Sequence, residues 1–297
     1  MIKWANILLL SLSVCACATL PKATGGSGWS FYTAHEFNDK DVDNQGQPLG
    51  FEQQTGATVN RGAKVDNATC VSVSDGVLHI KARRLDAPVD NGYGKAVEYA
   101  QGALRSAKPN SSQFWCCFTE NMRIEVRARR SAYTGLNDAI WFMPNGSGKW
   151  PACGEIDLLE NPKKKINNRA HFTLHTEHHY SGNGGSGGIT ASTKVEDMSD
   201  WNIYWMEWYP DKIIGGVNDT AYFTHHKGDT EDWPWSQEEG FYLILSRGLS
   251  TDADRWMGAV DYSTWPTPDA PTMDIDWIRV YTNKDFKGPK APKVKYY

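Results

Sequence analysis

The segment from Gly154 to Asn161 carries three acidic side chains, Glu155, Asp157 and Glu160, among apolar ones. Side chains alternate between the two faces of a regular β-strand, so Glu160 would point away from the other two acids and into the apolar face. One extra residue at Leu158-Leu159, a β-bulge, restores the alternation and turns Glu160 onto the face of the other two. Bulges of this kind are over-represented beside active sites.

The spacing of the two glutamates indicates chemistry at a glycosidic bond. With the bulge, Glu155 and Glu160 are four strand steps apart, roughly 13 Å between Cα atoms. Each side chain reaches about 4 Å inward, which leaves about 5 Å between the carboxyl groups, the separation of retaining rather than inverting glycosidases. One glutamate would attack the anomeric carbon, and the other would protonate the leaving oxygen and then activate water. Asp157 between them would raise the pKa of a neighbouring carboxyl by like-charge repulsion. A solvated acidic strand edge and a set of calcium ligands are the alternatives.

The composition is that of a globular protein with a neutral overall field. The chain has 297 residues and a formal net charge of -4, with 40% hydrophobic and 22% charged residues. Such a balance favours neither nucleic acid nor an anionic membrane, and it excludes a disordered chain. The 13 Trp and 13 Tyr residues exceed what a β core usually needs. Most would fill the core, and the remainder would suit the apolar faces of sugars. We expect a monomer.

Short runs with a two-residue period recur along the chain, separated by Gly, Asn, Asp and Pro. No long amphipathic helix interrupts them. This pattern favours an all-β fold, a β-sandwich, over alternating βαβ units. The expected strands are residues 76–83, 122–128, 139–143, 155–160, 170–176, 203–208, 221–224, 241–245 and 273–281.

The first residues are typical of an export signal. Lys3 precedes an apolar run, Trp4 to Val14, that is too short to span a bilayer. Two interpretations of its processing compete. Ala16-Cys17-Ala18 fits a small-residue cleavage site, whereas Val14 to Cys17 resembles a bacterial lipoprotein box with a lipidated Cys17. We favour the lipoprotein slightly, with an outer-membrane lipid anchor; either way the protein would be secreted or displayed at the cell surface.

The remaining domain boundaries follow from composition. We expect a signal peptide at 1–18, a linker at 19–29, one catalytic domain at 30–283 and a Lys-rich tail at 284–297. The four cysteines after the signal contain no CxxC pair, which argues against zinc. We expect small buried thiols and leave one disulfide open. These cysteines are Cys70, Cys116, Cys117 and Cys153.

The acidic segment resembles the Glu-x-Asp-x-x-Glu motif of glycoside hydrolase family 16 in its bulged form. Further similar segments follow the family's order over about residues 30 to 283, and the ordered set is more specific than any one of them. These segments are Met122 to Ala128, Ala139 to Pro144, Trp150 to Gly154, Thr173 to Thr176, Glu207 to Asp211 and Asp276 to Tyr281. The resemblance implies a lectin-like jelly roll with an open concave substrate cleft.

The resemblance also implies roles for individual residues. Glu155 would be the nucleophile and Glu160 the general acid/base, with Asp157 assisting. No cofactor would be required for the chemistry. The other implied positions are Trp141 and Trp150 stacking on sugars, His175 near the acid/base, Arg105 in the cleft, and Glu36 and Asp276 as ligands of a structural calcium. A core Trp, a strand His and a surface Arg are the plain alternatives for the sugar-binding positions.

The chain also departs from the family's glucan-cleaving members. It has Glu120-Asn121-Met122 where they often have Tyr-Gly, and Ser246 to Ser250 where they often have an Asn- and Gly-rich stretch. The arginine in that stretch, Arg247, would suit an anionic or sulfated sugar through charge-assisted hydrogen bonds. We therefore expect an endo-acting hydrolase of a red-algal galactan of the agar or porphyran type. A β-1,3(4)-glucanase and a non-catalytic lectin-like module are the alternatives.

Overall fold

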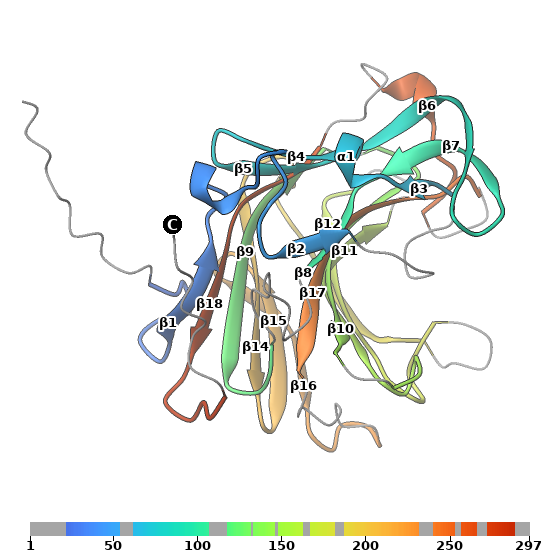
Figure 1. The fold of residues 1–297 in the computed structure, drawn as a ribbon. Helices are drawn as coiled ribbons and strands as arrows, with labels where there is room; N and C mark the ends of the chain where they lie inside the picture. Colours follow the sequence, from blue (N-terminus) through green and yellow to red (C-terminus); the bar gives the residue numbers. More distant parts are fainter. Residues whose placement is uncertain are drawn as a thin grey trace, which may run out of the picture.

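The computed structural model describes residues 22–53, 62–106, 118–131, 133–145, 148–162, 167–181, 187–231, 240–252, 257–265 and 272–288. Two large antiparallel sheets lie face to face and form a β-sandwich (Figure 1). The predicted all-β fold is confirmed. The only α-helix in the described part of the chain is the single turn α1 (Asn67–Cys70), and two short 3-10 turns (Asp39–Asp41 and Tyr262–Thr264) accompany it.

The eight-stranded sheet has the strand order β16-β15-β14-β9-β18-β5-β4, with β1 paired to β18. Its strands are β1 (Ser30–His35), β4 (Val71–Ser74), β5 (Val77–Ile80), β9 (Met122–Arg130), β14 (Asn202–Tyr209), β15 (Lys212–Val217), β16 (Thr220–His226) and β18 (Met273–Thr282).

The seven-stranded sheet has the order β13-β12-β11-β10-β17-β8-β2. Its strands are β2 (Phe51–Gln53), β8 (Ala103–Ser106), β10 (Leu136–Pro144), β11 (Glu155–Pro162), β12 (Arg169–His175), β13 (Ile189–Lys194) and β17 (Phe241–Leu249). A small sheet, β3-β7-β6, lies at one end of the sandwich (Figure 1). It comprises β3 (Lys64–Val65), β6 (Ala82–Asp90) and β7 (Ala96–Gln101).

The core between the two large sheets follows from the two-residue period of the strands. In β9, Ile124 and Val126 are buried in the main apolar cluster, and in β17 Leu243 and Leu245 join them from the facing sheet. Residues between these positions point to the outer face of each sheet. The sandwich therefore has two outer faces, and the acidic segment lies on β11 of the seven-stranded sheet.

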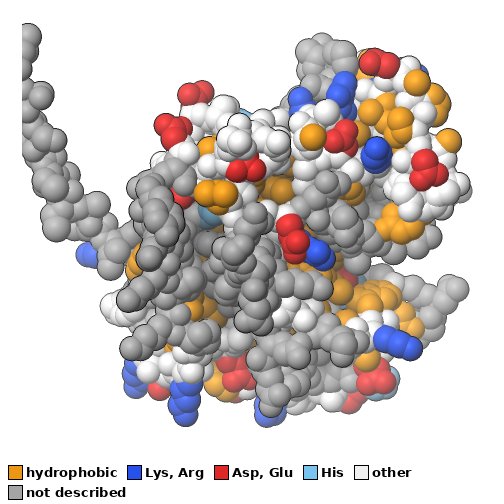
Figure 2. Space-filling view, in the orientation of Figure 1, with side chains coloured by type: hydrophobic (Ala, Val, Ile, Leu, Met, Phe, Trp, Pro, Cys, Tyr) orange, Lys and Arg blue, Asp and Glu red, His pale blue; other side chains and the backbone are white. Residues whose placement is uncertain are grey.

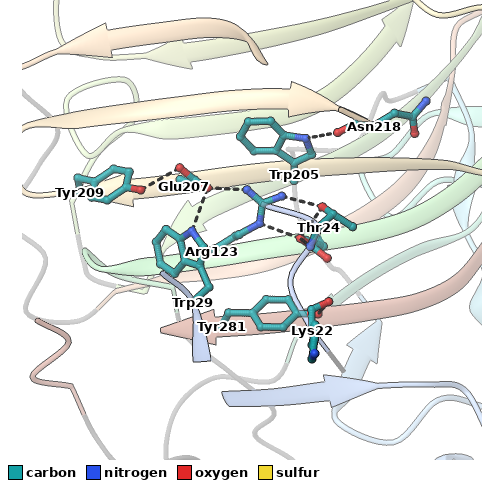
Figure 3. Close-up of polar contacts among 10 residues, drawn as sticks. Lys22, Thr24, Trp29, Arg123, Trp205, Glu207, Tyr209, Asn218 and Tyr281 are labelled. Carbon is teal, nitrogen blue, oxygen red and sulfur yellow. Dashed lines mark hydrogen bonds and ion pairs between the residues drawn. The ribbon is translucent and has the colours of Figure 1, made fainter. Parts of the chain in front are cut away.

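Residues 22–29 pack against the outer face of the eight-stranded sheet (Figure 3). Thr24 donates to Oε1 of Glu125 from its backbone nitrogen and from Oγ1, both at 2.8 Å. Trp29 donates from Nε1 to Oε1 of Glu207 at 3.0 Å. This part of the predicted linker packs on the sheet, because a carboxylate as buried as Glu125 needs hydrogen-bond donors and the segment supplies them.

Arg123 lies at the centre of this contact and is 1% exposed. Its guanidinium donates to Glu125 Oε1 at 2.7 Å, to Glu207 Oε1 at 2.6 Å and to Thr24 Oγ1 at 2.9 Å. It also lies 4.3 Å from the centre of the Trp205 ring. One buried cation thus ties two strands of the sheet to the N-terminal segment, as Figure 3 shows.

Several predictions fall on residues outside the described ranges. These are the signal peptide at 1–18, the start of the linker, Cys116, Cys117 and the end of the tail. Among the described residues, Cys70 and Cys153 are free thiols, and no helix is long and apolar enough to cross a membrane. The start of the tail packs on the domain, since Phe286 lies 5.5 Å from Tyr32 between ring centres. The predicted boundaries, export and monomeric state stay predictions.

The packing of the N-terminal segment predicts a steric effect at Gly25. A Cβ there would lie 2.6 Å from Nη1 of Arg123, whereas a Cβ at Gly28 meets nothing within 4 Å. We expect Gly25→Leu to destabilise the protein by about 1–3 kcal/mol through overpacking and to lower Tm by roughly 2–10 °C. Gly28→Leu is the matched control and should change Tm little. Equal effects of the two substitutions in a thermal melt would show that the segment does not pack as described.

Candidate active site

The acidic segment forms β11, and β11 contains the expected bulge. Against β10, Leu159 lies opposite Ile140 but Asp157 lies opposite Trp141, so Leu158 is a surplus residue. The register against β12 shifts over the same residues. Leu158 and Leu159 are both buried in the core. Because both leucines turn inward, the three acids share the face of the seven-stranded sheet that points away from the core, hereafter the site face.

Trp150 and His175 surround the first two acids. Trp150 donates from Nε1 to Oε2 of Glu155 at 2.6 Å. His175 lies opposite Glu155 on β12, and its Nε2 is 3.3 Å from Oδ2 of Asp157. The rings of Trp150 and Tyr180 meet edge to face at 5.4 Å between centres. The carboxylate of Glu155 is thus held between an indole donor and an Asp–His pair.

Glu160 has a different partner. Its Oε1 accepts a hydrogen bond of 3.0 Å from Nδ2 of Asn137 on β10. Glu160 lies opposite Ala139 on one side and His171 on the other.

The three acids share one electrostatic environment. Burial is the largest cause that raises the pKa of Glu155 to about 8, and the charge of Asp157 adds to it. Burial raises the pKa of Glu160 to about 7 against the hydrogen bond from Asn137, and the charge of Glu155 adds to the increase. The pKa of Asp157 is raised by burial and then by the charge of Glu160. The site therefore retains protons near neutral pH, as general acid catalysis requires.

The comparisons with known proteins agree with this geometry. The family model for glycosyl hydrolases family 16 matches residues 68–279. The chain belongs to this family.

The similar proteins are named for different substrates. A keratan-sulfate endo-1,4-beta-galactosidase from Sphingobacterium multivorum is 32% identical over 206 residues, which are 65% of this chain and 44% of that protein. A beta-glucanase from Rhodothermus marinus is 32% identical over 178 residues, 54% of this chain and 56% of that protein. The chain therefore spans about half the length of these curated relatives.

The fold is also that of solved structures in the family. The endo-beta-1,3-glucanase from Pyrococcus furiosus superposes with a TM-score of 0.68 and 25% sequence identity. The superposition covers 86% of this chain and 95% of that one.

Trp141 and Trp150 both reach the site face but differ in exposure. Trp141 lies opposite Asp157, is 6% exposed and donates from Nε1 to Oγ of Ser246 at 3.2 Å. Trp150 is 43% exposed. Trp150 therefore offers the larger open ring surface, and Trp141 forms part of the floor with its neighbour Ile244.

Arg105 also lies on the site face, several strands away from the acids. The sheet register places Glu52, Arg105, Ile244, Trp141 and Asp157 in one row across β2, β8, β17, β10 and β11. Nε of Arg105 is 2.8 Å from Oε1 of Glu52, and its side chain is 19% exposed. Its contact with substrate stays a prediction.

Arg247 lies on the other side of the sheet, and the prediction that it binds substrate is wrong. Its side chain is 0% exposed, with Nη1 2.9 Å from Oδ1 of Asp138 and Nη2 donating to the carbonyl of Ser131 at 2.8 Å. Strand alternation turns it inward with Leu243 and Leu245. Its charge is thus compensated within the core.

The predicted calcium ligands both have arginine partners. Glu36 accepts two hydrogen bonds from Arg279, at 2.8 and 3.0 Å, and Asp276 is paired with Arg127. Because each carboxylate is already paired with an arginine, neither offers a free negative charge to bind a calcium ion. The calcium expectation therefore stays a prediction that rests on the family resemblance alone.

Among the described residues, the one group of three potential metal ligands is Glu155, Asp157 and His175, whose ligand atoms lie within 4.8 Å of one another. These residues belong to the acid cluster itself. A cation would need both carboxylates ionised, whereas their raised pKa values favour protons.

Sequence reasoning missed several residues of the site face. Asn137 is the one that contacts a catalytic candidate, and Ser246 and Tyr180 support the two tryptophans. The signal for Asn137 was present: it precedes Trp141 by four residues, so strand alternation places both on one face. The expected strand began at residue 139 and therefore left Asn137 out.

The raised pKa of Glu155 predicts a pH-dependent cost in stability. Its folded pKa of about 8 exceeds its ordinary value of 4.5, so the folded state binds the proton more tightly. Wild-type stability should therefore fall as pH rises from about 4.5 to about 8. Glu155→Gln removes this loss, so its Tm should match wild type near pH 4 and exceed it by a few degrees at pH 9.

The exposed Glu98 provides the matched control, because its side chain is 57% exposed and lies outside the site. Glu98→Gln should not reproduce the pH-dependent difference. A constant difference between Glu155→Gln and wild type from pH 4 to 9 in thermal melts would contradict the raised pKa.

Proposed function

We propose that this chain is a retaining endo-β-glycosidase that hydrolyses a β-linked polysaccharide. The observation that carries the proposal is the bulge at Leu158, which brings Glu155 and Glu160 to one face of β11. Membership of family 16 supports it, and so does the raised pKa of Glu160, which keeps a general acid protonated near neutral pH.

Each glutamate has one role in the proposed reaction. A carboxylate oxygen of Glu155 attacks the anomeric carbon while the Glu160 carboxyl gives its proton to the departing glycosidic oxygen. The bond from carbon to that oxygen breaks, and a covalent glycosyl–Glu155 ester forms. Glu160, now ionised, takes a proton from water, whose oxygen attacks the anomeric carbon from the other side and releases Glu155. The two inversions retain the β configuration.

Asp157 and Trp150 support the nucleophile. The charge of Asp157 next to Glu155 resists accumulation of negative charge, so one proton stays in the cluster for Glu160 to use. The indole N–H of Trp150 holds one oxygen of Glu155, which orients the other oxygen for attack. Nε2 of His175 lies 3.3 Å from Oδ2 of Asp157 and gives that carboxyl group a polar neighbour.

Endo action is supported by the extent of the site face. The row of residues described above crosses five strands, which at about 4.8 Å spacing span roughly 19 Å. A polysaccharide chain can lie along such a row with sugars on both sides of the scissile bond. In Figure 2 the surface recedes between the β6–β7 hairpin and strands β10–β12.

For the substrate we propose a β-galactan of the red-algal type, agar or porphyran. The similar keratan-sulfate endo-1,4-beta-galactosidase from Sphingobacterium multivorum supports a galactose-containing polymer. Arg105 supports an anionic substituent at a distance from the acids, although Glu52 shares its charge. A β-1,3(4)-glucan is the second candidate, because the matching beta-glucanase and the Pyrococcus furiosus structure favour it.

The stereochemistry of the product tests the mechanism. Two displacements at one carbon retain configuration, so proton NMR of early hydrolysis should show the β-anomer first and the α-anomer only after mutarotation. Glu160→Ala should lose at least about 100-fold in activity because it removes the general acid. First appearance of the α-anomer would exclude the double displacement.

A panel of polysaccharides tests the substrate. Agarose, porphyran, κ-carrageenan, keratan sulfate, laminarin and lichenan should be compared in a reducing-end assay. We expect the highest rate on agarose or porphyran, and rates highest on laminarin or lichenan would establish the glucanase instead. If no polymer is cleaved yet wild type and Glu155→Gln bind one equally in affinity electrophoresis, the chain is a lectin-like module.

A further inference from the structure

Asn137 lies next to Glu160, the proposed acid/base, and donates a hydrogen bond to its carboxyl group. It lies on β10 of the site face and is 6% exposed. On its other flank, β17 presents Gly248, which has no side chain to compete for its amide. Its side chain makes two hydrogen bonds, one to Glu160 and one to the backbone of Asn161.

The two bonds fix the orientation of the amide. The backbone N–H of Asn161 donates to Oδ1 of Asn137 at 3.0 Å. A backbone N–H can only donate, so the atom that faces it must be the amide oxygen. The NH₂ group therefore faces Oε1 of Glu160, also at 3.0 Å, as a donor.

Asn161 is itself held from the core side of the sheet. Its side-chain oxygen accepts from Nη1 of Arg130, and its amide donates to the carbonyl of Arg169. Arg130 is paired with Asp138, with Nε 2.8 Å from Oδ2. Asp138 is the neighbour of Asn137 on β10, and its other oxygen pairs with Arg247.

This network joins the buried core to the site face. Arg130, Asp138, Arg247 and Asn161 are all 3% exposed or less. If one of these side chains moved away, it would leave a buried charge without its partner, which is strongly destabilising for the folded protein. The four side chains therefore have little freedom to rearrange. The backbone N–H that orients Asn137 is therefore held in place from behind.

We propose that Asn137 is a positioning residue that holds Oε1 of Glu160 and so directs the catalytic proton to Oε2. The proposal rests on the acid/base role of Glu160 given above. In a neutral carboxyl group the carbonyl oxygen is a stronger acceptor than the hydroxyl oxygen, so a donor that holds Oε1 favours the proton on Oε2. Oε2 then gives the proton to the glycosidic oxygen and takes one back from water.

The same bond also controls the strength of the acid. A donor stabilises the ionised carboxylate more than the neutral acid, because the hydrogen bond becomes charge-assisted. Asn137 therefore opposes the effect of burial on the pKa of Glu160. Without the donor, Glu160 would hold its proton to higher pH and release it less readily to the leaving group.

Two substitutions separate the donor from the packing of the side chain. Asn137→Asp keeps the size and the acceptor for the Asn161 N–H but replaces the donor with a negative charge. Asn137→Ala removes both bonds. Ser246→Ala is the matched control, because it removes a hydrogen bond to Trp141 on the same face without touching Glu160.

The first measurement is the titration of Glu160, followed by ¹³C NMR of labelled glutamate carboxyls and assigned with Glu160→Gln. We expect its pKa to rise in Asn137→Ala and to rise by at least about one unit in Asn137→Asp. Ser246→Ala should leave it unchanged. An unchanged Glu160 pKa in both Asn137 variants would overturn the proposal. This readout does not need activity, so a failure of the proposed function would appear separately, as a wild-type protein that cleaves no polymer.

The second measurement is the dependence on the leaving group. We expect Asn137→Asp to lose about 10- to 100-fold in kcat/KM on the polysaccharide, with the alkaline limb of the pH profile moved upward. It should keep most of its activity on a dinitrophenyl β-glycoside, whose leaving group needs no proton. Equal losses on both substrates, with an unmoved alkaline limb, would mean that Asn137 has only a structural role.

Discussion

The constraint on which the site depends is the inward direction of Leu158 and Leu159, two consecutive residues of one strand. Burying a leucine contributes about 1.5–3 kcal/mol, so the core favours a conformation in which both side chains point inward. The backbone satisfies this with one surplus residue in β11. As a consequence Glu155, Asp157 and Glu160 are forced to share a face and a low-dielectric environment. The chemistry thus follows from hydrophobic packing on the other side of the same strand.

The core behind the site is unusually polar. Arg130 and Arg247 share the carboxylate of Asp138 between two apolar sheets, where isolated charges would be costly. In proteins generally, replacing a buried ion pair by apolar residues of similar size is often neutral or stabilising. The structure uses these charges to hold Asn161 and, through it, a side chain of the site face. These charges fix the arrangement of the polar groups in this part of the core.

The site could be predicted from the sequence because the positions of the acids and leucines in the acidic segment conflict with a strict two-residue period. The three acids around Leu158 could satisfy that period only with a bulge, so both the bulge and the shared face were predictable. The same period predicts that Arg247 points inward with Leu245, but its charge favoured the opposite interpretation. A buried arginine becomes plausible only when its partner is known, and Asp138 comes from a strand more than 100 positions away.

Other elements could not be predicted because their stability comes from distant partners. Strand β15 contains Gly215 and Gly216, which strand propensities disfavour, yet Phe172 and Trp205 pack closely over them. Residues 22–29 are rich in Gly, Ser and Thr, which is typical of a linker. They are ordered by Arg123 and two glutamates that follow about 100 or more residues later. Propensity along the chain carries no information about such contacts.

The position of residues 22–29 on the domain determines which face of a membrane-anchored enzyme would point away from the bilayer. The segment as described begins at Lys22, whose carbonyl accepts from the hydroxyl of Tyr281 on the sheet opposite the site face. If Cys17 carries a lipid, the four intervening residues allow a tether of at most about 18 Å. Such a short tether would start on the outer face of the eight-stranded sheet, opposite the site face. The three acids would then face away from the bilayer, toward polymers too large to diffuse between the protein and the membrane.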